Sequence, residues 1–411
     1  MRYPPQTTWQ ITLAMLAAAA PVPRAWPHAI GEQSPLDFDA DRGTIDFQDE
    51  QAGVRAGSLR LLPSAAGSVA YDSNVFASPT ARDAQVLSLL EGQLHLENDP
   101  GASQFAGDGF ARTRRFREAH DQDTTEYGVS TSLDTLLGSG NEFSGAVLAQ
   151  RRFESRAEVE TPDIRSVSFY DESRASLSYS HTFNHLALRS TVSGQRFDFA
   201  ESSERIRDRA SYRGELGAAY QLHNGFSWIG SGYYSEDDYR FASPFTASAE
   251  TVGAMAGVRL NVPDIADFEL SGGYFQRHFA GDLGEISGLS LSGSLTWHPT
   301  RLLIVRADLQ RQDAPTRVTG AFGKVRTSGT LGVLHSYSRS VELYVRGRII
   351  EDRFDIIRES VRTFSTETGA TWMLSRRYVL AAEYDYATRT SAAIDSSFAR
   401  HLLSLSLIGR F

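Results

Sequence analysis

Alternating apolar and polar positions recur along most of the chain and predict amphipathic β-strands. Between residues 289 and 297 the apolar set is Leu289, Leu291, Gly293, Leu295 and Trp297, and serine and threonine lie between them. Successive side chains of a strand point to opposite faces, so this segment has one apolar and one polar face. The same alternation recurs at 127–133, 175–183, 212–220 and 341–349. A soluble sandwich would seldom repeat this pattern so often.

The pattern predicts about eighteen strands, with about sixteen as the alternative count. They lie near 58–76, 84–97, 103–116, 124–137, 141–155, 168–183, 185–199, 209–222, 226–240, 248–262, 267–280, 286–298, 302–313, 325–338, 341–354, 361–374, 377–391 and 397–411. Tight joints such as 138–140 and 223–225 leave no room for a crossover helix, so the sheet should be antiparallel and helices are not expected. Longer polar connections such as 156–167 and 200–208 alternate with these joints.

Short turns on one side and longer loops on the other are typical of a transmembrane antiparallel up-and-down β-barrel. The fold class predicted is therefore all-β. Both termini belong to the short-turn side, which is periplasmic in bacterial outer-membrane barrels. We expect the chain to reside in the outer membrane of a Gram-negative bacterium with both termini in the periplasm.

The last eleven residues form a strand that ends on an aromatic residue. Leu403, Leu405, Leu407 and Phe411 share one face. This strand resembles the assembly signal read by the barrel-insertion machinery, although Gly409 stands where such signals carry a bulky apolar residue. We therefore expect that machinery and outer-membrane lipid as partners, and an ordinary C-terminal edge strand is the alternative.

Composition excludes several other classes of protein. Cysteine is absent, so disulfides, thiolate metal sites and cysteine nucleophiles are excluded. The net charge is −9 and Lys324 is the only lysine, which disfavours a nucleic-acid partner. Beyond the N-terminus no apolar run approaches the about 20 residues of a membrane helix.

The N-terminal region predicts export. Residues 1–29 read as a signal peptide around the short apolar run 11–20, with several possible cleavage sites and a short buried helix as the alternative. Residues 30–57 are acidic and turn-rich, as in a flexible periplasmic leader. The barrel would then occupy residues 58–411.

Many charged residues alternate with the apolar face and should line the barrel interior. The lumen-lining candidates are Arg174, Arg213, Glu215, Arg306, Asp308, Glu342, Arg346, Arg348, Glu383 and Asp385. So many charges are incompatible with a dry interior unless nearly all of them are paired, and about eighteen strands leave an aqueous lumen. They could form cross-strand ion pairs that hold the wall, or a polar track for a hydrated solute.

One short motif points to a family. The first predicted barrel strand ends in Tyr71, Asp72, Ser73, Asn74, Val75 and Phe76. This segment resembles the opening strand of the putative beta-barrel porin-2 family, outer-membrane proteins associated with exopolysaccharide or capsule export. The resemblance implies passage of a polysaccharide cargo across the outer membrane, beside a periplasmic polysaccharide-export protein. Independently of function, Asp72 and Asn74 could cap a turn.

No residue pattern indicates an enzyme, a cofactor or a metal site. The histidines are scattered, and neither GxSxG nor HExxH occurs. The acidic run Glu236, Asp237 and Asp238 could bind Ca²⁺ or serve glycosidase chemistry, but it is expected to be a solvated rim in an outward loop. The function expected is a non-enzymatic conduit for exopolysaccharide or capsular polysaccharide export. The alternatives are a general or sugar-specific diffusion porin and a structural or adhesive barrel without transport.

Overall fold

The computed structural model describes residues 53–80, 82–99, 101–154, 167–223, 225–241, 246–281, 283–316, 318, 321–354, 359–391 and 396–411. Within these ranges the strands are β1 (Val54–Ala56), β2 (Leu59–Asp72), β3 (Gln85–Asn98), β4 (Ser103–Phe116), β5 (Thr124–Leu136), β6 (Asn141–Phe153), β7 (Phe169–Phe183), β8 (Leu186–Phe199), β9 (Arg209–His223), β10 (Phe226–Tyr239), β11 (Ala249–Val262), β12 (Ala266–Phe279), β13 (Glu285–Thr300), β14 (Leu303–Ala314), β15 (Lys324–Ser336), β16 (Val341–Phe354), β17 (Glu359–Met373), β18 (Tyr378–Ser391) and β19 (Phe398–Arg410).

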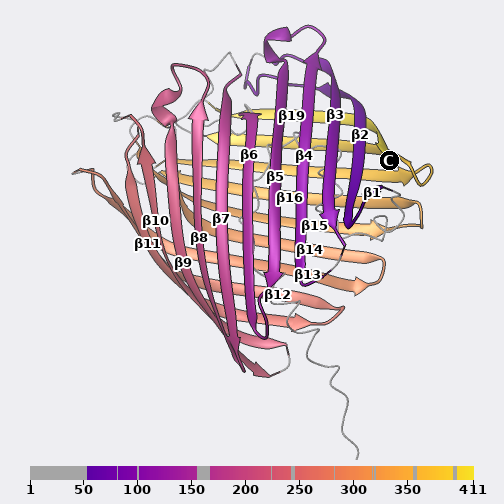
Figure 1. Ribbon diagram of the computed structural model, residues 1–411. Helices are drawn as coiled ribbons and strands as arrows, with labels where there is room; N and C mark the ends of the chain where they lie inside the picture. The colour runs from indigo at the N-terminus through magenta and orange to yellow at the C-terminus, as the bar shows by residue number, and fades with distance from the viewer. Residues whose placement is uncertain are drawn as a thin grey trace, which may run out of the picture.

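Strands β2 to β19 form a closed ring of eighteen strands within the described part of the chain, because each pairs with its chain neighbours and β19 pairs with β2. Every pairing is antiparallel, including β9 with β10, which joins the two halves of the ring. The strands of one wall run up the view while those of the opposite wall cross behind them (Figure 1). The predicted fold class and strand count are confirmed.

Two details differ from the sequence prediction. A short extra strand, β1, pairs with the start of β2 within the segment expected to be a leader. Single-turn 3₁₀ helices η1 (His120–Gln122) and η2 (Arg205–Arg207) occupy two of the longer loops, where no helix was expected. Neither of them, nor any other helix in the described ranges, could cross a membrane.

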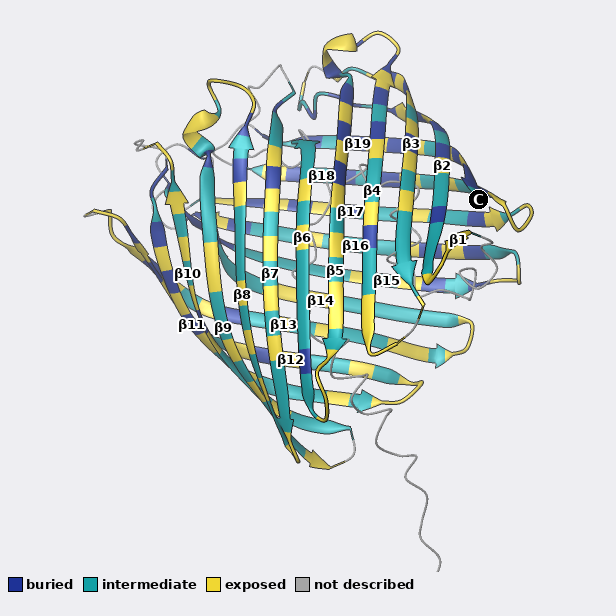
Figure 2. Ribbon diagram, viewed as in Figure 1, coloured by how far each residue is buried: buried dark blue, intermediate teal, exposed yellow. Residues whose placement is uncertain are grey.

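The strand faces alternate between the outside of the barrel and its interior (Figure 2). On β19, Leu405 is 54% exposed, whereas Ser406 on the other face is 3% exposed. On β13, Leu289 is 67% exposed beside the buried Ser290. Because the exposed set is apolar, the outer face is suited to lipid and the polar face lines the interior.

The structure explains why position 409 holds a glycine, where assembly signals carry a bulky apolar residue. A Cβ atom on Gly409 would lie 3.1 Å from the Phe411 ring and 3.6 Å from Tyr378. The missing side chain therefore leaves room for the terminal aromatic ring on the outer face. Phe411 also donates its backbone N–H to the Pro63 carbonyl of β2 at 3.0 Å, so the last residue is fixed to the first barrel strand.

Leu405→Arg should destabilise the barrel by about 2 to 4 kcal/mol, because it places a charge on the lipid face near the middle of β19. The matched control is Ser404→Arg, which places the same charge on the inner face one residue away. We expect the first variant to lose heat-modifiable folded protein in the outer membrane and the control to retain it. Equal folded levels of the two variants would contradict the assignment of Leu405 to the lipid face.

Candidate functional site

A charged patch lies on the inner wall of β14 and β16. Arg306, Gly332 and Arg346 occupy one cross-strand row, and Asp308 and Arg348 flank Thr330 in the next. Only β15 separates the two charged strands, so their backbones lie about 10 Å apart at a strand spacing of about 4.8 Å. We call Arg306, Asp308, Arg346 and Arg348 the inner patch.

The inner face is accessible to solvent around this patch. Asp308 is exposed although it belongs to the inner face, and so are Ser292 and Ser294 on the neighbouring β13. The opposite faces of both strands carry exposed apolar residues such as Leu289 and Leu309. Exposure on both faces of the wall indicates a hydrated interior, which is the environment that an eighteen-stranded barrel provides.

The predicted lumen-lining residues all lie on the inner face, and several form short contacts. Arg346 Nη1 lies 3.6 Å from Glu367 on β17, and Arg174 Nη2 lies 2.7 Å from Glu172. The other contacts include Arg213 with Glu215 at 2.9 Å and the Tyr344 hydroxyl, which donates to Glu383. Arg306, Asp308, Glu342, Arg348 and Asp385 share the inner face, where Glu342 and Asp385 are buried.

A second series of charges, which the sequence analysis did not identify, crosses β3 to β6. Arg112 lies 3.1 Å from Glu91 and 3.7 Å from Glu126, and Arg152 reaches Glu126 at 3.3 Å. Glu91, Arg112 and Glu126 are buried, so their charges depend on one another. The inward alternation of these strands was the signal that could have identified them.

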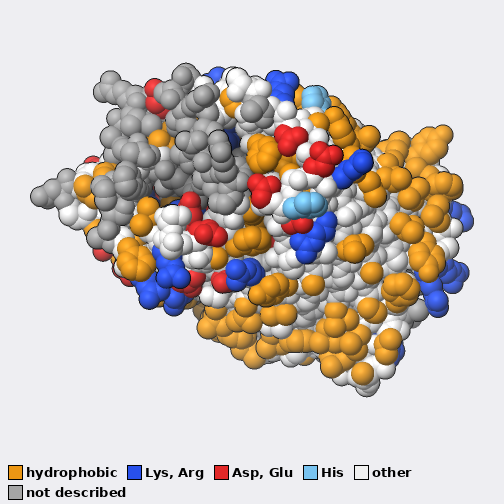
Figure 3. All heavy atoms as spheres, turned by 90° about the horizontal axis from the view of Figure 1, so that it is seen from above, with side chains coloured by type: hydrophobic (Ala, Val, Ile, Leu, Met, Phe, Trp, Pro, Cys, Tyr) orange, Lys and Arg blue, Asp and Glu red, His pale blue; other side chains and the backbone are white. Residues whose placement is uncertain are grey.

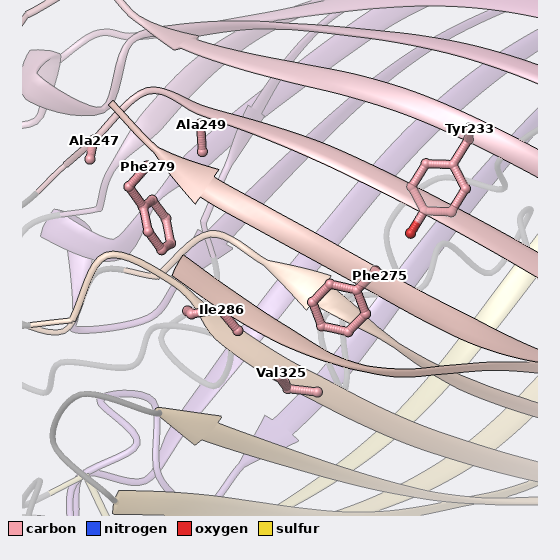
Figure 4. Close-up of a cluster of buried hydrophobic side chains, with 7 residues drawn as sticks. All are labelled: Tyr233, Ala247, Ala249, Phe275, Phe279, Ile286 and Val325. Carbon is pink, nitrogen blue, oxygen red and sulfur yellow. The ribbon is translucent and has the colours of Figure 1, made fainter. Parts of the chain in front are cut away.

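The loop end of the β14–β15 hairpin leaves the wall and lies over the inner face of β12 and β13. The pairing of β13 with β14 begins only at Leu291 with Arg311, so residues 285–290 have no partner on β14. Alternation along β15 would turn Val325 outward. Its side chain nevertheless packs with the inward Phe275 and Ile286 (Figure 4). This hairpin end therefore narrows the loop-side mouth of the barrel.

Ion pairs hold the hairpin end in this position. The buried Arg277 of β12 donates to Asp313 at 2.8 Å and to Asp237 at 2.7 Å. The expectation that Asp237 lies in a solvated outward loop is therefore wrong. Strand β10 extends to Tyr239, and its alternation turns Asp237 inward between the outward Glu236 and Asp238.

Four aromatic residues of the inner face lie across glycines of the next strand. The pairs are Phe110 with Gly128, Tyr233 with Gly253, Phe275 with Gly288 and Tyr344 with Gly369. A Cβ on Gly369 would come within 2.5 Å of the Tyr344 ring. Such cross-strand pairs let a ring lie along the wall and cover the exposed backbone of the glycine. The rings are thereby kept out of the lumen.

The family motif joins the loop ends of β2 and β19. Asp72 is fully buried and accepts hydrogen bonds from Arg400 Nη2 at 2.6 Å and Nε at 3.0 Å. The fully buried Asn74 donates to the backbone oxygens of Ser78 at 2.8 Å and Ala399 at 3.0 Å. The two side chains thus connect the first barrel strand, its following loop and the last strand.

The rest of the motif packs or pairs at the same place. Ser73 exchanges two hydrogen bonds with the backbone of His401, at 2.8 and 2.9 Å. Val75 is buried in a cluster that includes Phe116 and Leu402, and Phe76 packs against it. The motif therefore fastens the loop end of the seam and fills the interior beside it.

A cation at the loop-side mouth is held by two carboxylates. Arg207 in η2 contacts Glu154 at 2.5 Å and Glu204 at 2.9 Å, and its guanidinium stacks over Phe199 at 3.9 Å. Burial lowers the pKa of Arg207, but Glu154 and Glu204 more than offset this effect and hold the pKa above its usual value. The loop contact is therefore charged at any physiological pH.

The closed barrel, its apolar outer face and its charged interior define an outer-membrane β-barrel of the porin type. The family model described as "Putative beta-barrel porin 2" matches residues 49–411, and the chain belongs to this family. A search of curated proteins returned no match.

This chain is similar to several solved structures at low sequence identity. OccAB3 of Acinetobacter baumannii is 10% identical, with 87% of this chain and 100% of that chain covered and a TM-score of 0.45. OpdK of Pseudomonas aeruginosa, determined with vanillate, is 10% identical over 85% of this chain and 99% of that chain, with a TM-score of 0.45. OpdL of Pseudomonas aeruginosa is 11% identical, with 87% of this chain and 99% of that chain covered and a TM-score of 0.44.

Gly369→Ala should displace the Tyr344 ring from the wall and break its hydrogen bond to Glu383, because the new methyl group overlaps the ring. We expect a lower single-channel conductance in planar bilayers. The control is Gly332→Ala on the inner face of β15, where the nearest atoms are carbonyl oxygens 4.0 Å away. Equal conductance in the two variants would mean that the ring does not border the open path.

Asp72→Ala should lower the free energy of unfolding by about 3 to 5 kcal/mol, because it removes the buried carboxylate to which Arg400 donates through Nε and Nη2. Asp72→Asn keeps the shape and one acceptor oxygen, so a smaller loss is expected. Urea unfolding of the folded barrel in detergent, followed by tryptophan fluorescence, measures both. An unchanged midpoint for Asp72→Ala would contradict a stabilising role of the motif.

Proposed function

We propose that this protein is a diffusion porin that passes small hydrophilic solutes through its lumen, with the long loops facing outward and both termini in the periplasm. The observation that carries the proposal is the exposure of polar inner-face residues, Asp308, Ser292 and Ser294, on the same strands that present apolar side chains outside. A barrel with only a structural or adhesive role would have no need of a hydrated interior.

The charge arrangement supports weak rather than tight solute contact. Acidic and basic side chains gather near the middle of the molecule when it is viewed from above, while hydrophobic side chains cover the outer wall (Figure 3). Within the lumen, arginines alternate with carboxylates, as in the contact of Arg346 with Glu367. Conduction requires contacts that are favourable enough for entry and weak enough for release.

Export of a polysaccharide, which the resemblance to the family implied, has no support from the comparisons, and the porin alternative agrees with them better. The hairpin end fixed by Arg277 also narrows the loop-side mouth, which favours small solutes over a polymer. Liposome swelling distinguishes the alternatives. We expect swelling with monosaccharides that declines as oligosaccharide length increases. Absence of swelling with any solute would favour a barrel without transport.

Replacing Arg346 and Arg348 together with Glu should lower the anion-to-cation permeability ratio by about threefold or more. Each unit charge close to a permeating ion contributes on the order of 1 kcal/mol in a hydrated lumen. Reversal potentials across a salt gradient in planar bilayers give the ratio, and heat modifiability checks folding.

The control for this variant is Arg196→Glu, which reverses an exposed arginine on the outer face of β8. It should leave the permeability ratio unchanged. If the double variant also leaves the ratio unchanged, the inner patch serves only as wall ion pairs and does not face the ion path.

A further inference from the structure

A basic cluster lies on the outer face of β14, β16 and β17 at their loop ends. Glu351 accepts from Arg362 Nε at 3.0 Å and Nη2 at 2.9 Å through one oxygen, and its other oxygen lies 2.9 Å from Arg353 Nη2. In the same cross-strand row, Arg311 of β14 donates to Thr327 of β15 at 2.9 Å. We call Arg311, Glu351, Arg353 and Arg362 the outer basic cluster.

The outer basic cluster carries more positive than negative charge. Arg353 and Arg362 share the single carboxylate of Glu351, and Arg311 adds a third guanidinium group in the same cross-strand row. Elsewhere on the outer face, Arg196 lies 2.7 Å from its own carboxylate, Asp198, and Arg151 lies 3.6 Å from Asp171. Charges balance within each of these two pairs but not within the cluster.

Two arginines of the cluster are highly accessible. Arg353 and Arg362 are 54% and 69% exposed at the side chain, whereas Glu351 between them is 17% exposed. Because one carboxylate uses both of its oxygens to hold the two side chains next to each other, the guanidinium groups are prepositioned and their other donors can reach a ligand.

An apolar stripe lies directly below the cluster. Two residues closer to the turn end of β14, β16 and β17, the outer face carries Leu309, Ile349 and Phe364, which are all exposed. They continue into the lipid-facing wall through Val345 and Leu331. Two residues of a strand span about 7 Å, so the arginines stand one step above the region suited to acyl chains. Strands β14 to β17 follow one another on one wall of the barrel (Figure 2).

We infer that the outer basic cluster binds the phosphate group of a glycolipid in the outer leaflet, with the acyl chains of that lipid against Leu309, Ile349 and Phe364. Paired guanidinium groups match the oxygens of a phosphate, and the adjacent apolar stripe matches the tail that the same molecule carries. This inference rests on the proposed orientation with the loops outward. It does not depend on the passage of solute through the lumen.

The test compares lipid retention by the folded full-length barrel and its variants in detergent. The probes are bisphosphorylated lipid A, the same lipid after removal of both phosphates, and phosphatidylglycerol. Bound lipid is measured by native mass spectrometry. Replacing Arg353 and Arg362 together with Gln should weaken retention of bisphosphorylated lipid A by about fivefold for each arginine, and should not change retention of the dephosphorylated lipid.

Two further variants sharpen the test. Arg196→Gln removes an equally exposed outer arginine that is already paired, so retention should equal that of the unaltered protein. Replacing Arg353 and Arg362 with Lys keeps the charge but removes the planar guanidinium groups with their paired donors. We therefore expect an intermediate loss of lipid A retention. Heat modifiability confirms that each variant is folded.

Three results would overturn the inference. The first is unchanged lipid A retention in the Gln variant, and the second is an equal loss in Arg196→Gln. The third is an equal effect on phosphatidylglycerol, which would indicate nonspecific attraction of anionic lipid. Bilayer conductance of the Gln variant should match that of the unaltered protein, so failure of the lipid site and failure of the porin proposal are separable. Protection of the long loops from protease on intact cells would remove the orientation and the lipid site together.

Discussion

Closure of the sheet is the constraint on which the rest of the structure depends. A backbone N–H or carbonyl that faces hydrocarbon without a partner costs several kcal/mol, so strands can span a membrane only in a ring without edges. Here the ring closes between β2 and β19. The buried pair of Asp72 and Arg400 fixes this seam at its loop end, and the bond from Phe411 to Pro63 fixes it at its turn end.

Closure also determines the environment of every side chain. Once the register is fixed, alternate residues face lipid or the interior, and a shift of one residue would exchange the two sets. The interior then holds many charges at a low free-energy cost because water and opposite charges reach them, as they do for Arg346 and Glu367. Glycines such as Gly369 leave room for inward aromatic rings along the wall.

The two ends and the two faces of the barrel differ accordingly. At the loop end, the inner face is covered by apolar contacts around Phe275 and Val325 and by the pairs of Arg277, whereas the middle of β13 and β14 is exposed within the lumen. The outer face changes from an apolar wall to charged groups near the same end. A narrowed mouth, a hydrated interior and a charged outer rim therefore all belong to one closed sheet.

The sequence by itself determined the class of fold, the approximate number of strands and the face of nearly every strand residue. This was possible because an alternation with a period of two can be recognised from neighbouring residues alone. It also placed the inner patch, since strand order in a meander follows chain order. The tertiary structure alone decided the contact of Asp72 with Arg400, which lie at opposite ends of the chain, and the inward turn of the β14–β15 hairpin end. Those contacts join residues that no local period connects. The error at Asp237 has a different origin, because the predicted strand 226–240 already contained this residue and its alternation places Asp237 inward, whereas only the structure shows that its partner is Arg277.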